Sequence, residues 1–534
     1  MLYTTWIKEK VRKSSITNFV FIAALAAAIP AHGAEQLGKV KFATSCDPAV
    51  QEQFERGVAM LHSFWISAAQ KTFREVVEKD PSCVIARWGF ASILMSNPLA
   101  GQGASPKGAA LAQTAIEQGR KIGAKTERER DYLEAVAAYY ENFAGRPERE
   151  RQMARAKAYE ALAARYPDDD EAQIFYALYL AGTQSQADQT FAAYLKAAAI
   201  LEKQFVKHPD HPGVAHYLIH SYDAPPIAAQ GLPAARRYAE IAPSAPHALH
   251  MPSHIFTRVG AWEDSVVTNQ RSAAVALKGD EPVGALHASD YLVYAYLQLA
   301  RDGDARRVVD DAARLTGFRA QAGHYALAAM PARYAIERGD WKGAMKLELV
   351  ENSLHFTEAL TRYARALGAA RSGDAAAAQV EVEKLALLRD ALIAKKNAYW
   401  ATEVEVNRLA AAAWTALAQG KKEEALSLMR SAADTEDRNE KHIVTPGRIA
   451  PARELLGEML LELKQPALAL KEFEASQKRE PNRFRGFYGA ALAAEASGDR
   501  QKAADNFTKL LAMTKDADSG REELRRAKAY IAAR

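Results

Sequence analysis

Apolar residues recur every three to four positions along nearly the whole chain from Glu35 onward, which is the period of amphipathic α-helices. No stretch shows the sustained two-residue alternation that is typical of a half-buried β-strand. Pairs such as Gly-Asp, Gly-Lys and Asp-Pro interrupt the helical pattern at intervals and indicate turns. The pattern therefore predicts an all-α protein built from many short helices.

Two neighbouring segments near the C-terminus share one spacing. Gly457 and Ala491, small residues in the first predicted helix of each segment, are 34 residues apart, and so are Phe473 and Phe507 in the second helix. A small residue lets two helices pack closely, and an aromatic residue can fill the space between neighbouring pairs. An amphipathic helix pair cannot bury its apolar face alone, so units of this kind are expected to stack.

This spacing resembles the tetratricopeptide repeat (TPR), a helix–turn–helix unit of about 34 residues. The resemblance extends over most of the chain and implies a right-handed superhelical α-solenoid of antiparallel helix pairs. We expect a TPR-like array of helical hairpins over residues 35–433 and a polar, proline-containing linker over 434–448. A C-terminal TPR pair is expected over residues 449–520, followed by a capping helix over 521–534.

Residues 1–34 have the features of a secretory signal peptide. A basic segment at residues 8–13 precedes an apolar run of about ten residues, and small residues follow, with cleavage expected after Gly33 or Ala34. The apolar run is short compared with the roughly 20 residues that span a bilayer. We therefore expect an exported protein, periplasmic in a Gram-negative bacterium or otherwise secreted, with no stable membrane span after cleavage.

Export changes how the charge and the cysteines are interpreted. The 534 residues carry a net charge of +5, but the leader holds four positive charges and one negative, which leaves +2 for the remainder. This near-neutral balance gives no indication of a nucleic-acid partner. Cys46 and Cys83 are the only cysteines, and each precedes a predicted helix. An oxidising compartment permits a disulfide between them, and two buried free thiols are the alternative.

Histidine is concentrated in one part of the chain, because nine of its 13 histidines lie within residues 208–324. Five of them fall on single faces of two predicted helices, with spacings of i,i+4 in the first helix and i,i+3,i+7 in the second: His216, His220, His247, His250 and His254. The intervals from His216 to His250 and from His220 to His254 are both 34 residues, one repeat length. His287 stands apart and is expected at the start of a helix.

The histidine spacing favours a metal site. Imidazoles at i,i+4 can reach one ion from the same helix face, and packed helices are about 8–10 Å apart. We predict that a transition metal is bound by four residues: His216, His220, His250 and His254. Neutral imidazoles without thiolates suit Zn or Cu, and also Ni. Pro252 is expected to disturb the helix and to weaken the shared face around His254.

The TPR resemblance implies that these helices line a concave groove. We expect the groove to bind a peptide, a protein or a small ligand, with further contacts from six residues: His247, Arg258, Asp290, Arg333, Tyr217 and Asp223. Two alternatives stay open: a groove that binds its ligand without metal, and a purely structural hydrogen-bond network. His62 is compatible with packing or with ligation.

The phrases at residues 61–65, 211–220 and 247–256 resemble a group of exported bacterial TPR proteins with HxxxH and HxxHxxxH phrases, for which no reaction is implied. A zincin-type peptidase needs glutamate beside the first histidine, and Tyr217 stands there instead. Motifs for phosphate binding and for a nucleophilic serine are also absent from the sequence. The first expected function is ligand binding in the groove, with or without metal. The alternatives are a Zn- or Cu-dependent redox or hydrolytic enzyme and an assembly scaffold.

Overall fold

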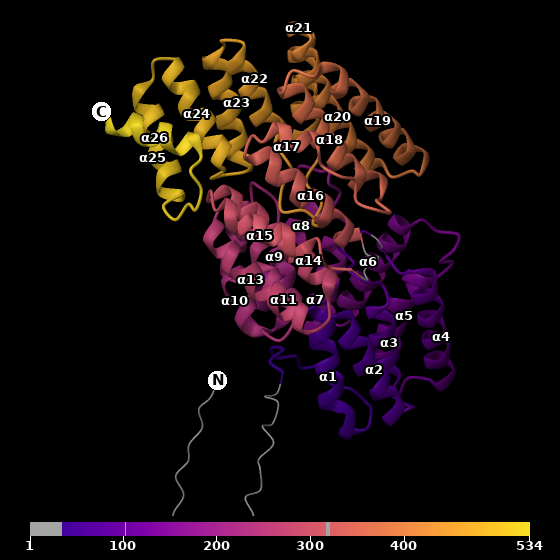
Figure 1. Cartoon of the computed structure of the whole chain (residues 1–534). Coiled ribbons are helices and arrows are strands. Elements are labelled where there is room, and N and C mark those ends of the chain that lie inside the picture. Colours follow the sequence, from indigo (N-terminus) through magenta and orange to yellow (C-terminus); the bar gives the residue numbers. More distant parts are fainter. Residues whose placement is uncertain (1–34, 102, 317–320, 534) are drawn as a thin grey trace, which may run out of the picture. The chain divides into compact units, whose positions relative to one another are not determined.

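The computed structural model describes residues 35–101, 103–316 and 321–533, and every regular element within these ranges is a helix (Figure 1). The predicted signal peptide at residues 1–34 lies outside the described residues. Residues 36–534 form one compact unit. None of the described helices combines the length and apolar character needed to cross a membrane. The all-α prediction is confirmed.

The N-terminal part of the array consists of nine helices: α1 (Pro48–His62), α2 (Ile66–Lys79), α3 (Val84–Ile93), α4 (Pro106–Ile122), α5 (Glu127–Tyr140), α6 (Glu148–Arg165), α7 (Asp170–Ala181), α8 (Ala192–Lys207) and α9 (Pro212–Ser221). The middle part contains η1 (Ala228–Gly231), α10 (Leu232–Ile241), α11 (Pro246–His250), α12 (Pro252–Arg258), α13 (Trp262–Lys278), α14 (Pro282–Gln298), α15 (Asp302–Ala312) and α16 (Gln321–Glu337). The C-terminal part contains α17 (Trp341–Met345), α18 (His355–Arg371), α19 (Ala375–Ala394), α20 (Ala398–Ala418), α21 (Lys422–Asp437), α22 (Ala452–Glu462), α23 (Pro466–Arg479), α24 (Phe484–Ala496), α25 (Arg500–Met513) and α26 (Glu522–Ala532).

The helices stack as the repeat pattern predicts. Most helices contact the next helix in the chain, and alternate helices also contact one another, as in the series α14, α16, α18, α20, α22 and α24. The first helix of each hairpin therefore packs against the first helix of the hairpin that follows, which is the packing of an α-solenoid. The array also contains a return contact, because α1 packs against α9. This contact brings the end of α1 to the histidine-rich helices.

A phenylalanine wedged between two glycines explains the close packing of successive hairpins. The Phe473 ring of α23 lies against Gly457 of α22 and Gly489 of α24, and a Cβ atom at either glycine would overlap the ring. Phe473 is fully buried. The same arrangement recurs near the N-terminus at Gly57, Phe73 and Gly89. The small residues and the aromatic residue of the repeat thus form one contact.

Substituting Gly489 with alanine is expected to destabilise the C-terminal hairpins by about 1–3 kcal/mol, because the added methyl group overpacks the Phe473 site. Chemical denaturation measures the loss as a lower unfolding midpoint. Gly284→Ala is the matched control, since a Cβ atom there meets only Ala276 Cβ at an ordinary 3.5 Å. Equal stability of the Gly489 variant and the wild type would show that the wedge does not set the helix spacing.

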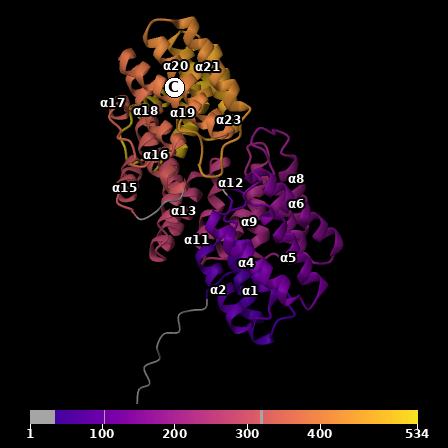
Figure 2. The ribbon, with the colours of Figure 1, turned by 90° about the vertical axis from the view of Figure 1, so that its right-hand side faces the viewer.

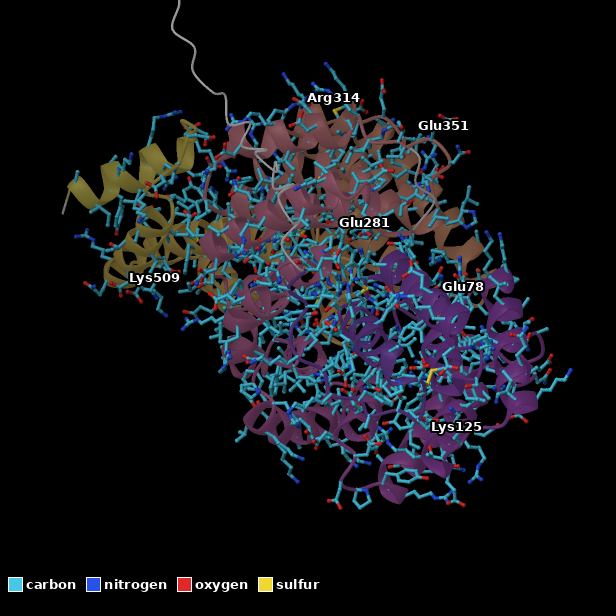
Figure 3. The ribbon with its side chains drawn as sticks, turned by 90° about the horizontal axis from the view of Figure 1, so that it is seen from below. Glu78, Lys125, Glu281, Arg314, Glu351 and Lys509 are labelled. Carbon is cyan, nitrogen blue, oxygen red and sulfur yellow. A yellow bond between two sulfur atoms is a disulfide. The ribbon has the colours of Figure 1, made fainter. Side chains whose placement is uncertain are left out.

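A disulfide joins Cys46, just before α1, to Cys83, the residue that precedes α3. Figure 3 draws this disulfide as a yellow bond between the two sulfur atoms. Asp80 lies close to the two sulfurs, but thiols that are bonded to each other offer no thiolate to a metal. The bridge fixes the start of the first hairpin onto the second.

The segment predicted as a linker, residues 434–448, is not an exposed connection. Helix α21 continues to Asp437, and most of the chain after it is buried until α22 begins. We call residues 438–451 the return loop. Its Glu440 N–H donates to the Gln186 carbonyl at 2.8 Å, and its Thr445 carbonyl accepts from the Tyr291 hydroxyl at 3.2 Å. The polar character of this segment reflects buried ionic and hydrogen-bonding groups and not solvent exposure.

Candidate metal centre

Six histidines come together from three helical segments: α9, the consecutive helices α11 and α12, and α14. Figure 1 labels α9, α11 and α14 near one another. Helix α9 carries His216 and His220, α14 carries His287, and the remaining three lie on α11 and α12. Met251 joins α11 to α12 with helical dihedral angles (φ −53°, ψ −38°), and its N–H donates to the His247 carbonyl at 3.0 Å. Pro252 interrupts the helix as expected, since α11 ends at His250 and α12 begins at Pro252, but the helical dihedral angles of Met251 keep the two segments in line.

The histidines form two groups of three and not one group of four. Triad A consists of His216, His220 and His247, and triad B consists of His250, His254 and His287. Within each triad, one nitrogen from every ring lies within 4.8 Å of the others. The four predicted ligands are thus divided between the triads, His216 and His220 in one and His250 and His254 in the other; His247 and His287 complete them, and His247 and His254 are seven residues apart, about 10.5 Å along a helix. Rings separated by two turns serve two sites.

Hydrogen bonds fix the tautomers in triad B. His250 Nδ1–H donates to Asn269 Oδ1 at 2.7 Å, and the Asn269 amide is oriented by donating through Nδ2 to the Ser265 carbonyl at 2.8 Å. His254 Nδ1–H donates to Asp223 Oδ2 at 2.8 Å. Both neutral rings therefore carry their lone pair on Nε2, and these two Nε2 atoms are 3.1 Å apart. Two acceptor lone pairs at this distance repel each other unless a cation lies between them.

In triad A a hydrogen bond fixes the tautomer of one ring. His216 Nδ1–H donates to the His62 carbonyl at 2.6 Å, so its Nε2 atom carries the lone pair. This atom lies 3.2 Å from His247 Nε2, which can donate a proton to it or share a metal ion with it. His220 Nε2 is buried and has no hydrogen-bond partner among the described residues. Two nitrogens at 2.0–2.1 Å from a tetrahedral ion are about 3.3 Å apart. The distances in both triads match shared ligation of an ion.

Burial keeps the six imidazoles neutral. His216, His220, His250 and His254 are at most 2% exposed. Desolvation and the neighbouring histidines lower the pKa of the ring in His216, His220, His247, His250 and His287 well below the ordinary value. Burial also lowers the pKa of His254, although the Asp223 carboxylate opposes this shift. Neutral rings at pH 7 have the lone pairs that metal ligation needs.

A buried ionic cluster supports triad B from outside. Arg258 Nε donates to Asp223 Oδ1 at 2.8 Å, Arg258 Nη2 donates to Glu440 Oε1 at 2.8 Å, and Lys441 Nζ lies 3.4 Å from Asp223 Oδ2. Burial alone would raise the pKa of Asp223, but Lys441 and Arg258 hold it well below its ordinary value. Burial, together with Arg258, lowers the pKa of Lys441 to about 8. The ionised Asp223 orients His254, as the outer groups of metal sites do.

Three residues predicted to contact a groove ligand belong elsewhere. The Tyr217 hydroxyl lies 2.9 Å from His62 Nδ1, on a face of α9 that is separate from the triads. Arg333 and Asp290 face each other at 3.7 Å and are fully buried, and Arg333 also donates to two carbonyls of the return loop. Burial raises the pKa of Asp290 to about 6. These side chains hold the fold around the site and do not line a groove.

His62 belongs to a separate network. Its Nε2 atom lies 2.9 Å from Glu171 Oε2, and His211 Nε2 lies 2.9 Å from Glu171 Oε1. His211 Nδ1 accepts from the Val214 N–H at 3.3 Å. All four ring nitrogens of His62 and His211 therefore have a hydrogen-bond partner: the Glu171 carboxylate, the Tyr217 hydroxyl or the Val214 N–H. The side chain of His62 has a structural role, whereas its carbonyl orients His216.

Sequence reasoning missed His287 and Tyr291 of α14. His287 was expected at a helix start outside the site, yet its ring centroid is 4.4 Å from that of His250. The Tyr291 hydroxyl lies 3.3 Å from His254 Nε2. The signal was present in the sequence, because His287 follows His254 by 33 residues, close to one repeat length.

One pocket borders histidines of both triads. A cavity of about 500 Å³ borders His247, His250 and His287, and its other walls include Phe64, Ile66 and Glu281. Glu281 is labelled in Figure 3, and Figure 2 shows α2 next to α11, two of the helices that line this cavity together with α13 and α14. The volume of this pocket is in the range that accommodates a small molecule, and ligand binding in a concave groove stays a prediction.

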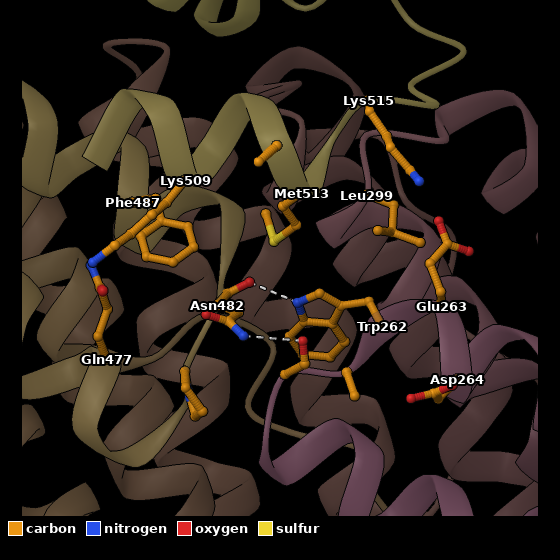
Figure 4. A pocket seen from close by; sticks show the side chains of 14 residues that line it. Trp262, Glu263, Asp264, Leu299, Gln477, Asn482, Phe487, Lys509, Met513 and Lys515 are labelled. Carbon is orange, nitrogen blue, oxygen red and sulfur yellow. Dashed lines mark hydrogen bonds between the residues drawn. The ribbon is translucent and has the colours of Figure 1, made fainter. Parts of the chain in front are cut away.

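A larger cavity of about 620 Å³ lies away from the histidines, between the start of α13 and the C-terminal hairpins. Figure 4 shows Trp262 on one side of it and Lys509 and Met513 on another. The Trp262 indole N–H donates to the Asn482 carbonyl at 2.7 Å. This cavity brings no cluster of metal-ligating side chains together, so the histidine pocket is the better candidate site.

Of the comparisons with known proteins, only the search of solved structures gives a similarity, and it is weak. No protein-family model matches the chain, and no curated protein sequence matches it. Among solved structures, a chain in the crystal structure of the APC/C hetero-tetramer Cut9–Hcn1 is similar over 89% of this chain and 95% of that chain, with 11% sequence identity and a TM-score of 0.28. A TM-score this low establishes no equivalence between individual helices.

Proposed function

We propose that this protein is an exported metalloprotein in which the two histidine triads hold transition-metal ions and present them to a small molecule in the adjoining pocket. The observation that carries the proposal is the pair of Nε2 atoms of His250 and His254, 3.1 Å apart, with both Nδ1 atoms already acting as donors. A proton between the rings would require a buried imidazolium beside Lys441 and Arg258, which burial and these cations oppose. A metal ion satisfies both lone pairs.

Three histidines for each ion leave coordination positions for an exogenous ligand, as in catalytic metal sites. His247, His250 and His287 border the pocket, so these positions are expected to open toward it. Among the residues that line the pocket, Glu281 is the only carboxylate, and its Oε1 atom already accepts from Trp65 and Ser67. Hydrolysis would have the Oε2 atom of Glu281 as its one carboxylate base among the lining residues. We favour ligand binding coupled to redox chemistry.

Export is part of the proposal and is supported by the disulfide between Cys46 and Cys83, because such bonds persist in oxidising compartments. Expression of the full chain in a Gram-negative host tests it. The mature protein is expected in the periplasm with an N-terminus after Gly33 or Ala34. A full-length N-terminus in the cytoplasm would contradict export without bearing on the metal site.

Metal analysis of protein purified without a histidine tag tests the metal proposal. The expected result is at least about one equivalent of copper or zinc per chain after reconstitution and removal of free ions. Retention of less than about 0.2 equivalents of any transition metal would contradict the proposal, since a site of buried, oriented imidazoles does not stay vacant in the presence of the ion.

A further inference from the structure

The two triads are close neighbours. The rings of His220 in triad A and His254 in triad B have centroids 5.6 Å apart, and those of His247 and His250 are 6.1 Å apart. Ions in the two triads would therefore be separated by a few ångströms, the range in which two metals share one ligand. The pocket borders His247 of triad A as well as His250 and His287 of triad B. A single small molecule in the pocket can thus reach both ions.

The charges around the triads leave the ions uncompensated. Each triad supplies three neutral nitrogens and no carboxylate ligand. The nearby buried acids, Asp223 and Glu440, are matched by Arg258 and Lys441. Two divalent cations would therefore add positive charge to a buried site with no excess of acidic side chains, which strongly favours the entry of an anion. Such an anion can reach the ions through the pocket that histidines of both triads border.

Resting on the metal proposal above, we propose that the two triads form one dinuclear copper centre, in which a small solvent anion such as hydroxide or chloride bridges the two ions. Copper is the divalent ion that nitrogen-only donors bind most tightly along the first transition series. Three imidazoles to each ion leave room for the shared ligand. The centre is a single site made by α9, the α11–α12 segment and α14, and its open face is the pocket.

Copper content and electron paramagnetic resonance (EPR) together test the dinuclear centre. Full-length protein is loaded with Cu(II) in chloride buffer, freed of unbound copper and analysed by both methods. We expect two copper ions per chain and an EPR intensity below about a tenth of that copper, because a bridging anion couples the two unpaired spins. An EPR signal that accounts for all the bound copper, or a limit of one ion per chain, would overturn the inference. Loss of all copper on desalting would instead overturn the metal proposal on which it rests.

Variants that remove one triad give the matched comparison. His220→Ala takes a ligand from triad A only, so the variant is expected to retain one copper, and its EPR intensity per bound copper is expected to rise about tenfold, to equal its copper content. His287→Ala does the same for triad B and serves if the first variant does not fold. His355→Ala, outside both triads, is expected to keep the weak signal of the wild type. An uncoupled wild type with unchanged spectra in both triad variants would contradict the dinuclear centre.

Discussion

Replacing His216 and His250 together with alanine is expected to reduce the bound metal from about two equivalents to below about 0.2. Each substitution removes an Nε2 ligand from a different triad, and each lost nitrogen belongs to one of the two closest pairs, at 3.2 and 3.1 Å. Two remaining histidines in each triad cannot hold an ion against dialysis. Elemental analysis after equilibration with copper or zinc, with free ions removed, measures the effect.

The control for this double variant is His355→Ala, because His355 lies at the start of α18 outside both triads. It is expected to retain the full metal content. Helical circular dichroism of the double variant is expected to match that of the wild type, since alanine is well tolerated within α9 and α11. A folded double variant with undiminished metal would show that the ions are bound elsewhere.

The second large effect is a steep loss of stability in acid for the metal-free protein. Burial lowers the folded-state pKa of all six triad histidines, so below about pH 6.5 the unfolded chain binds protons that the folded chain does not. Stability is therefore full above pH 6.5 and falls as the pH decreases. Six such groups contribute up to about 8 kcal/mol per pH unit to the slope. This exceeds the total stability of many domains within two pH units.

Denaturant unfolding of metal-free protein at several pH values from 7.5 to about 5 measures this slope. Carboxylates with ordinary pKa values near 4 contribute little in this window, but burial raises the pKa of Asp290 to about 6, of Glu454 to about 7 and of Glu436 to about 8, and these three groups oppose the histidine slope. The variant with His216 and His250 replaced by alanine loses two of these groups, and its slope is expected to be shallower by up to about 2.7 kcal/mol per pH unit. An unfolding free energy that stays constant between pH 7 and 5.5 would show that the triad histidines are not held neutral by burial.

The helices, their stacking and the single-face spacing of the histidines could be predicted from the sequence, because these follow from short-range periodicity. The Phe473 wedge is an example, since the small and aromatic positions of the repeat already indicate close packing. The i,i+4 spacing of His216 and His220 likewise placed both rings in triad A. Local rules of this kind are set by helix geometry alone.

The division into two triads could not be predicted in the same way. It depends on the height at which α9 and α14 cross the α11–α12 segment, which is set by tertiary packing. The charged residues around triad B could not be predicted either. Lys441 contacts Asp223 from 218 residues away, and it lies within a segment whose polar composition indicated a linker. A buried charge cluster and an exposed linker have similar compositions, and only the fold separates them.

The most direct test of the account is anomalous X-ray scattering from crystals of the copper-loaded protein, recorded on both sides of the copper absorption edge. The account predicts two anomalous peaks, one among the Nε2 atoms of His216 and His247 and one between those of His250 and His254. Each peak is expected about 2 Å from its nitrogen ligands. Bound copper with no peak at either triad would contradict the central claim that these histidines are a metal centre.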